Sequence, residues 1–209
     1  MIDLSTNYLG LKLKNPVVVS ASPLTEKFDN FERLRDAGAS SIVMYSLFEE
    51  QIEAESENLD AAMEYGVNSY AESTSYLPDL PKYQIGPDRY LDLLHKAKKA
   101  VDIPVIASLN GNSRGGWTRY AEYMEEAGAD ALELNIFNVP TDPSVTSEQL
   151  ERGYCDLVRA VRKAVKIPIS VKLGPYFTSM ANFAKCLSEA GADGIVIFNR
   201  FYQPDFDLE

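Results

Sequence analysis

The segment AGADALELNI, residues 127–136, returns as AGADGIVIFN at 190–199 and in looser form as AGASSIVMYS at 37–46. In each copy, Ala-Gly-Ala stands at the end of an amphipathic stretch, where the glycine suits the left-handed position that closes a helix. A short apolar run of strand character follows at once. Each copy therefore predicts a helix, a tight turn and a buried strand.

A second repeated segment alternates with the last two copies. VDIPVIASLNG at 101–111 resembles VKIPISVKLG at 165–174, and in both Ile-Pro leads into an apolar run. Proline at the start of a strand removes no ladder hydrogen bond, so both runs are predicted strands. Pro104 and Pro168 lie 64 residues apart, and Gly128 and Gly191 lie 63 apart. A repeat of this length that holds two strands and two helices indicates a duplicated βαβα unit.

The rest of the chain continues the alternation of strands and helices. We expect an N-terminal hairpin over residues 2–14 that turns at Gly10. The expected strands cover 16–21, 40–46, 103–110, 130–137, 168–173 and 194–199, and the expected helices cover 28–37, 87–101, 115–127, 146–165 and 178–190. Strands that alternate with helices predict a parallel sheet covered by helices.

Two architectures fit this pattern, a doubly wound sheet and a (β/α) barrel. The first strand leads into SASPLTEK at 20–27, which lacks the Gly-rich phosphate loop of many doubly wound folds. The repeat favours the TIM-type (β/α)8 barrel, which usually needs about 250 residues. We therefore expect one partial barrel domain over 1–209, with about six of eight βα units and a truncated C-terminal end. Within it, the acidic, Tyr-rich stretch 47–86 is a predicted insert after the second strand.

Composition limits the classes of partner. The net charge is −11, so nucleic acid is not expected as a partner, because its binders carry basic patches. The sequence has no run of 18 apolar residues, so no membrane span is predicted. Its first residues lack the apolar core of a signal peptide. A cytoplasmic location is predicted, with Cys155 and Cys186 as reduced thiols packed within helices.

In barrels of this type, functional side chains lie at the carboxyl ends of the strands. At those positions the chain has mainly amides and hydroxyls: Ser20, Ala21, Ser22, Tyr45, Ser46, Ser108, Asn110, Asn112, Asn135, Asn138, Lys172, Asn199 and Arg200. Such a set can hold a polar planar ligand through hydrogen bonds. The single histidine, His95, falls within a predicted helix, so no metal site is expected.

Lys172 is the one cation predicted to point into the barrel. Val171 and Leu173 should face the helices, so the alternation of a strand turns Lys172 inward. A buried lysine needs an anionic or acceptor partner. That partner is either a ligand or Glu133, which the same alternation turns inward on the neighbouring strand.

Five ordered motifs resemble the class 1 dihydroorotate dehydrogenases: LGLKLKNPVVVSASPLT at 9–25, VIASLNGN at 105–112, ALELNIFNVP at 131–140, ISVKLGPYF at 169–177 and GIVIFNR at 194–200. That family is an FMN-binding barrel that oxidises dihydroorotate, in pyrimidine metabolism, by removing a proton and a hydride. The resemblance implies FMN contacts by Ser20, Ala21, Ser22, Ser46, Asn110, Asn135 and Lys172, the last at the flavin N1 edge or the ribityl chain. It implies substrate contacts by Tyr45, Asn138 and Asn199, and a possible homodimer.

The chain departs from the family pattern at three places. Tyr45 replaces the family's lysine after the second strand, and 65–81 has no clear equivalent of the loop that grips the substrate. The segment LNIFNVPTD at 134–142 lacks the Cys or Ser that serves as the family's catalytic base, so no catalytic residue is assigned. Of the family's motif after the fourth strand, this segment keeps only Asn138. The family builds its FMN phosphate site after strands seven and eight, which this chain would lack.

These observations predict an FMN-dependent oxidoreductase that transfers a hydride from a small cyclic, dihydropyrimidine-like substrate to the flavin. Two alternatives remain open. One is a barrel that binds a ligand without catalysis. The other is a phosphate-binding lyase or isomerase, which needs an acid/base pair that only Lys172 and Glu133 could supply.

Overall fold

The computed structural model describes residues 2–49, 87–110, 114–136 and 140–199. In chain order its elements are β1 (Thr6–Tyr8), β2 (Leu11–Leu13), β3 (Val18–Val19), the 3-10 helix η1 (Pro23–Glu26), α1 (Asp29–Asp36), β4 (Ser41–Phe48), α3 (Pro87–Ala100), β5 (Val105–Asn110), α4 (Arg114–Glu126), β6 (Ala131–Ile136), α5 (Ser147–Ala164), β7 (Ile169–Leu173), α6 (Met180–Ala190) and β8 (Gly194–Ile197). The predicted helices and strands are confirmed, although the strand expected over 16–21 is reduced to the two residues of β3. Most of the predicted insert lies outside the described residues.

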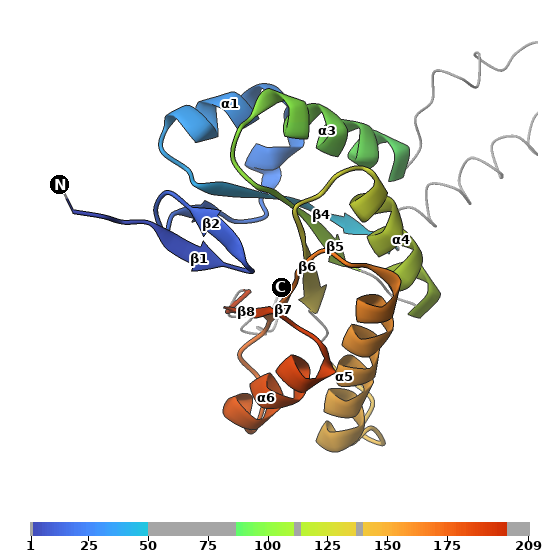
Figure 1. Cartoon of the computed structure of the whole chain (residues 1–209). Coiled ribbons are helices and arrows are strands. Elements are labelled where there is room, and N and C mark those ends of the chain that lie inside the picture. Colours follow the sequence, from blue (N-terminus) through green and yellow to red (C-terminus); the bar gives the residue numbers. More distant parts are fainter. Residues whose placement is uncertain (1, 50–86, 111–113, 137–139, 200–209) are drawn as a thin grey trace, which may run out of the picture.

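Six strands form one parallel sheet in the order β3-β4-β5-β6-β7-β8. Each strand pairs with the next one in the sequence. A doubly wound sheet would show a reversal of the strand order, and this sheet has none among its six strands. Helices α3, α4 and α5 lie on the outer side of the curved sheet (Figure 1). The predicted partial (β/α) barrel is therefore confirmed.

Most of the core lies between the strands and the outer helices. Alternate strand residues such as Leu134 and Val171 are fully buried there, together with Phe183 of α6. Trp117 of α4 joins this core and is 5% exposed, whereas His95 of α3 is exposed at the surface. No described helix is long and apolar enough to span a membrane.

The β1–β2 hairpin closes the amino-terminal end of the barrel interior. Its two-residue turn, Leu9-Gly10, has positive φ at both residues, which is the geometry of a tight hairpin turn. The Leu9 side chain packs on Val43 and Ile106 at the start of the strands. Gly194 at the start of β8 leaves room for it, because a Cβ there would lie 2.6 Å from Leu9 Cδ2.

The two copies of Ala-Gly-Ala-Asp make the same contacts. The Asp130 carboxylate accepts a hydrogen bond from the Val105 N–H, and the Asp193 carboxylate accepts one from the Ile169 N–H. Each also pairs with a basic residue of the helix that precedes the recipient strand, Lys98 for Asp130 and Arg162 for Asp193. The aspartate of each repeat thus fixes the start of the neighbouring strand, which explains its recurrence.

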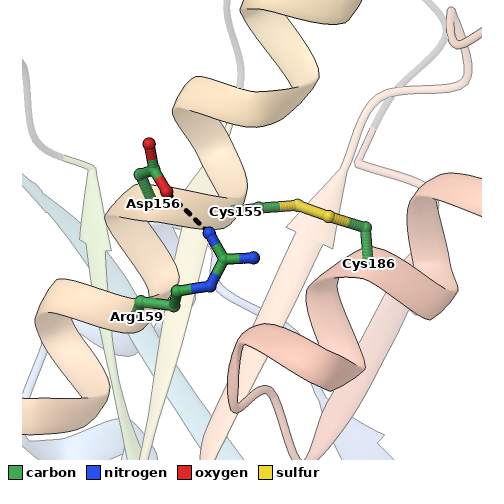
Figure 2. The surroundings of a disulfide bond; sticks show 4 residues. All are labelled: Cys155, Asp156, Arg159 and Cys186. Carbon is green, nitrogen blue, oxygen red and sulfur yellow. Dashed lines mark hydrogen bonds and ion pairs between the residues drawn. A yellow bond between two sulfur atoms is a disulfide. The ribbon is translucent and has the colours of Figure 1, made fainter.

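The prediction of two reduced thiols is wrong. Cys155 of α5 and Cys186 of α6 form a disulfide whose Cα atoms lie 6.4 Å apart. The two side chains point toward each other across the gap between the helices (Figure 2). Helical periodicity had placed each cysteine on a packed face, but periodicity within one helix does not show which residue of the next helix it meets.

Candidate functional site

Polar side chains fill the interior of the barrel at the carboxyl half of the strands, in two tiers. The lower tier consists of residues that lie side by side in register: Ser46, Ser108, Glu133 and Ser170. The upper tier lies one step nearer the strand ends and contains Asn135 and Lys172, which face each other on β6 and β7. The interior therefore changes from the apolar hairpin contact to polar groups along the same strands.

A register shift in β4 places Ser46 in this site. Val43 pairs with Ile106 and Ser46 with Ser108, so β4 has one more residue than β5 between these pairs. This bulge turns Tyr45 outward, where its ring meets that of Tyr90 with the centroids 5.0 Å apart. The Tyr90 hydroxyl accepts a hydrogen bond from the Ser108 N–H and donates one to the Ser108 carbonyl oxygen. Tyr90 thus holds the backbone next to the bulge.

A chain of hydrogen bonds joins the two tiers. The Asn199 Nδ2 donates to Asn135 Oδ1 at 2.8 Å, and the Asn135 Nδ2 donates to Ser46 Oγ at 3.4 Å. Ser46 and Ser108 share a hydrogen bond between their hydroxyls at 2.8 Å. Because both ends of the Asn135 amide have partners, its orientation in the barrel mouth is fixed.

Lys172 and Glu133 form a buried ion pair. The Lys172 Nζ lies 3.7 Å from Glu133 Oε1, and the two residues are only 8% and 2% exposed. At this distance the charges attract, but the two atoms do not form a hydrogen bond. Within the described residues, Glu133 Oε1 is buried without any hydrogen-bond partner. The predicted inward orientation of both side chains is confirmed, and so is their proximity.

Burial has a clear effect on the Glu133 carboxyl group. Desolvation raises the pKa of Glu133 above its ordinary value, and the positive charge of Lys172 partly opposes that rise. Two nearby phenols are also affected by burial, which raises the pKa of Tyr8 and of Tyr90. Both phenols therefore remain neutral at physiological pH.

The remaining predicted site residues fall into three groups. Asn110 ends β5, opposite Phe48, at the level of the upper tier. Ser20, Ala21 and Ser22 follow β3; Ser20 is exposed, Ala21 packs toward the hairpin contact, and the Ser22 carbonyl accepts a hydrogen bond from Thr25. Asn112, Asn138 and Arg200 lie outside the described residues. The structure thus brings Ser46, Asn135, Lys172 and Asn199 together and turns Tyr45 away.

Sequence reasoning missed two polar residues. Ser170 lies beside Glu133, and the alternation in ISVKL at 169–173 already turns it inward. Glu49, the residue directly after β4, is 1% exposed, and its carboxylate lies against Gly116 of α4, where any Cβ would overlap it. The Gly115-Gly116 pair in the sequence was a signal for such a close approach.

The site offers one buried ammonium group together with amide and hydroxyl groups. No group of three or more His, Cys, Asp or Glu side chains among the described residues could hold a metal ion. The arrangement suits an organic ligand with several hydrogen-bond acceptors or a negative charge on its buried edge.

Comparisons with known proteins show which proteins this chain resembles. The family model described as Dihydroorotate dehydrogenase matches residues 81–207. The catalytic subunit of Dihydroorotate dehydrogenase B (NAD(+)) from Methanocaldococcus jannaschii is 27% identical over 201 residues, which cover 94% of this chain and 62% of the relative. The NAD-dependent dihydropyrimidine dehydrogenase subunit PreA of Escherichia coli K12 is 27% identical over 208 residues, covering 94% of this chain and 48% of that protein. The chain therefore spans about half to three-fifths of these relatives.

A solved structure shows the same fold. Phosphonopyruvate hydrolase in complex with oxalate and Mg²⁺ superposes with a TM-score of 0.51 and 18% sequence identity, covering 90% of this chain and 59% of that one. At this identity the similarity shows the barrel architecture alone.

Proposed function

The chain belongs to the dihydroorotate dehydrogenase family, and from this premise we propose that it binds FMN and acts as an oxidoreductase on a small cyclic, dihydropyrimidine-like substrate. The observation that carries the proposal is the buried Lys172 ammonium group, which lies beside the fixed amide of Asn135 at the carboxyl end of the strands. This is the end at which barrel enzymes bind their ligands.

The residues present fit a flavin. An isoalloxazine ring has hydrogen-bond acceptors along its pyrimidine edge, and this edge gains negative charge when the ring is reduced. A lysine ammonium and an amide N–H are suitable partners for such an edge. Because the Lys172 Nζ lies beyond hydrogen-bond distance of Glu133 Oε1, the ion pair does not engage the N–H donors of the lysine.

Each described residue then has a defined task. Lys172 would stabilise negative charge at the flavin edge, and its low exposure strengthens that interaction by excluding water. Asn135, held by Asn199 and Ser46, would orient the ring without rearrangement. FMN itself supplies the capacity to accept a hydride. Asn110 and Asn199 would contact the ring or the substrate at the rim of the mouth.

The proposal is tested by titration of the purified chain with FMN, followed by flavin fluorescence and visible absorption. The wild type should perturb both signals, and Lys172→Met should weaken FMN binding at least tenfold. Lys185→Met is the matched control, because Lys185 is exposed on α6 and pairs only with Glu189 within the described part of the chain. Equal affinities of the two variants, or no perturbation by the wild type, would overturn the assignment.

Substrate class is tested separately, with the FMN-loaded protein under anaerobic conditions. Dihydroorotate, dihydrouracil and dihydrothymine are added in turn, and loss of the flavin absorption band reports reduction. Bleaching by one of them identifies the substrate. A protein that binds FMN but is bleached by none would instead support a binding role without dehydrogenation of this class.

A further inference from the structure

The buried ion pair of Lys172 and Glu133 carries a further inference, which rests on the proposed function. We propose that Glu133 is a positioning residue: an internal counter-ion that holds the Lys172 ammonium from below and limits the positive charge that the site presents to its ligand.

The strand register defines the geometry of this pair. Glu133 lies on β6 beside Ser170, whereas Lys172 lies on β7 beside Asn135. The carboxylate is therefore one tier deeper than the residue that it pairs with. An ammonium group attracted from below keeps its upper side directed toward the strand ends, where a ligand would lie.

Within the described residues, Lys172 is the only charged group paired with Glu133. The two flanking hydroxyls are engaged elsewhere, since Ser108 bonds to Ser46 and Ser170 Oγ donates to the Leu132 carbonyl oxygen. Glu133 Oε1 consequently receives no hydrogen bond. A carboxylate buried in this way is stabilised mainly by the charge of Lys172.

The charge balance predicts the effect on a ligand. With Glu133 ionised the pair is neutral as a unit, and with glutamine in its place the site carries one full positive charge. A ligand that becomes negative, as a flavin does on reduction, is stabilised more strongly by the unbalanced ammonium. Glu133 should therefore lower the midpoint potential of the bound flavin.

The first test measures that potential in the FMN-loaded protein by equilibration with a reference dye. Glu133→Gln should raise the midpoint potential, whereas Glu133→Asp, which keeps the charge, should remain near the wild type. Glu122→Gln, on the exposed face of α4, is the matched control and should cause no shift. An unchanged potential in Glu133→Gln would overturn the proposal while leaving FMN binding intact.

The second test needs no cofactor and so separates this proposal from the proposed function. The rate at which an amine-selective reagent labels Lys172 is measured at one fixed pH by peptide mass spectrometry. Without the carboxylate that attracts it from below, the Lys172 side chain is held less firmly, so Glu133→Gln should be labelled several-fold faster than the wild type. Equal labelling rates for wild type and Glu133→Gln would contradict the pairing.

A third measurement leaves Glu133 unchanged, in case its substitution prevents folding. The carboxyl ¹³C signal of Glu133 is titrated in the wild type and in Lys172→Met. Removal of the positive charge should move the pKa of Glu133 upward, because Lys172 lowers it. An unmoved pKa would show that the two groups are not coupled.

Discussion

The two ends of the barrel interior use the same strands for opposite purposes. At the amino-terminal end, Leu9 of the hairpin meets Val43 and Ile106, and the contact is entirely apolar. At the carboxyl end, inward positions of the same strands carry Ser108, which is fully buried, and Asn110. Within one strand, β5, the interior thus changes from Ile106 to Ser108 in two residues.

This difference shows how the fold separates stability from ligand binding. At the amino-terminal end, called the closed end below, burial of apolar side chains stabilises the fold, and these side chains need no hydrogen-bond partner. At the carboxyl end, called the open end below, burial of polar side chains costs free energy, which hydrogen bonds and the ion pair only partly offset. Substitutions at the closed end should therefore affect folding most, and substitutions at the open end should affect ligand binding most.

We expect the largest loss of stability from a substitution at the closed end. Ile106→Ala removes a fully buried side chain and should lower the free energy of unfolding by about 2–5 kcal/mol. Urea denaturation followed by circular dichroism measures the change. Ile106→Val, which removes a single methylene, should cost only about 0.5–1.5 kcal/mol. A loss for alanine no greater than that for valine would mean that the hairpin contact is not closely packed.

A smaller effect tests the fit between the hairpin and β8. A Cβ at Gly194 would meet Leu9 Cδ2 at 2.6 Å, so Gly194→Ala should cost about 1–3 kcal/mol. Addition of Leu9→Ala should remove the clash, so the two losses should not be additive in a double-mutant cycle. Gly153→Ala is the matched control, because a Cβ there meets nothing within 4 Å and alanine favours the helix. Additive losses would argue against the contact.

Ionisation of Glu133 at the open end should make the stability of the protein depend on pH. Because burial raises the pKa of Glu133 in the folded protein above its ordinary value of 4.5, the folded state holds this proton more tightly than the unfolded state. Ionisation of Glu133 then reduces stability as the pH rises from 4.5 through the raised pKa. The wild type should lose stability relative to Glu133→Gln over this window, and parallel curves would contradict the shift.

We expect the smallest loss of stability from a substitution at Asn199, at the rim of the barrel mouth. Asn199→Ala removes the donor to Asn135 Oδ1 and should cost no more than about 1 kcal/mol in unfolding free energy. The same variant should weaken FMN binding, because the Asn135 amide loses one of its two fixed partners. Urea denaturation and FMN titration on the same sample compare the two effects. A large stability loss with unchanged FMN affinity would reverse the assignment of this end.

The repeats in the sequence were enough to predict the architecture. Ala-Gly-Ala-Asp and Ile-Pro recur because each has a local task, the helix end and the strand start, which the sequence expresses directly. The inward orientation of Lys172 and Glu133 followed from the alternation of strand residues. These features depend on neighbours in the chain, which is why they could be predicted.

Features that depend on pairing between distant segments could not be predicted. Uninterrupted alternation from Val43 would turn Tyr45 inward, and the bulge that turns Ser46 inward instead exists only in the pairing of β4 with β5. The partner of Cys155 likewise depends on how two helices pack. The Tyr90 contact with Ser108 joins residues 18 positions apart in different elements, and no local pattern signals it.

The disulfide encloses the strand that carries the site's cation. Cys155 and Cys186 are 31 residues apart, and β7 with Lys172 lies between them. A protease that cuts once inside this loop therefore leaves both products covalently joined. Such a nicked chain would migrate as one band on a non-reducing gel and as two after reduction, and the strand bearing Lys172 would stay attached to the barrel after the cut.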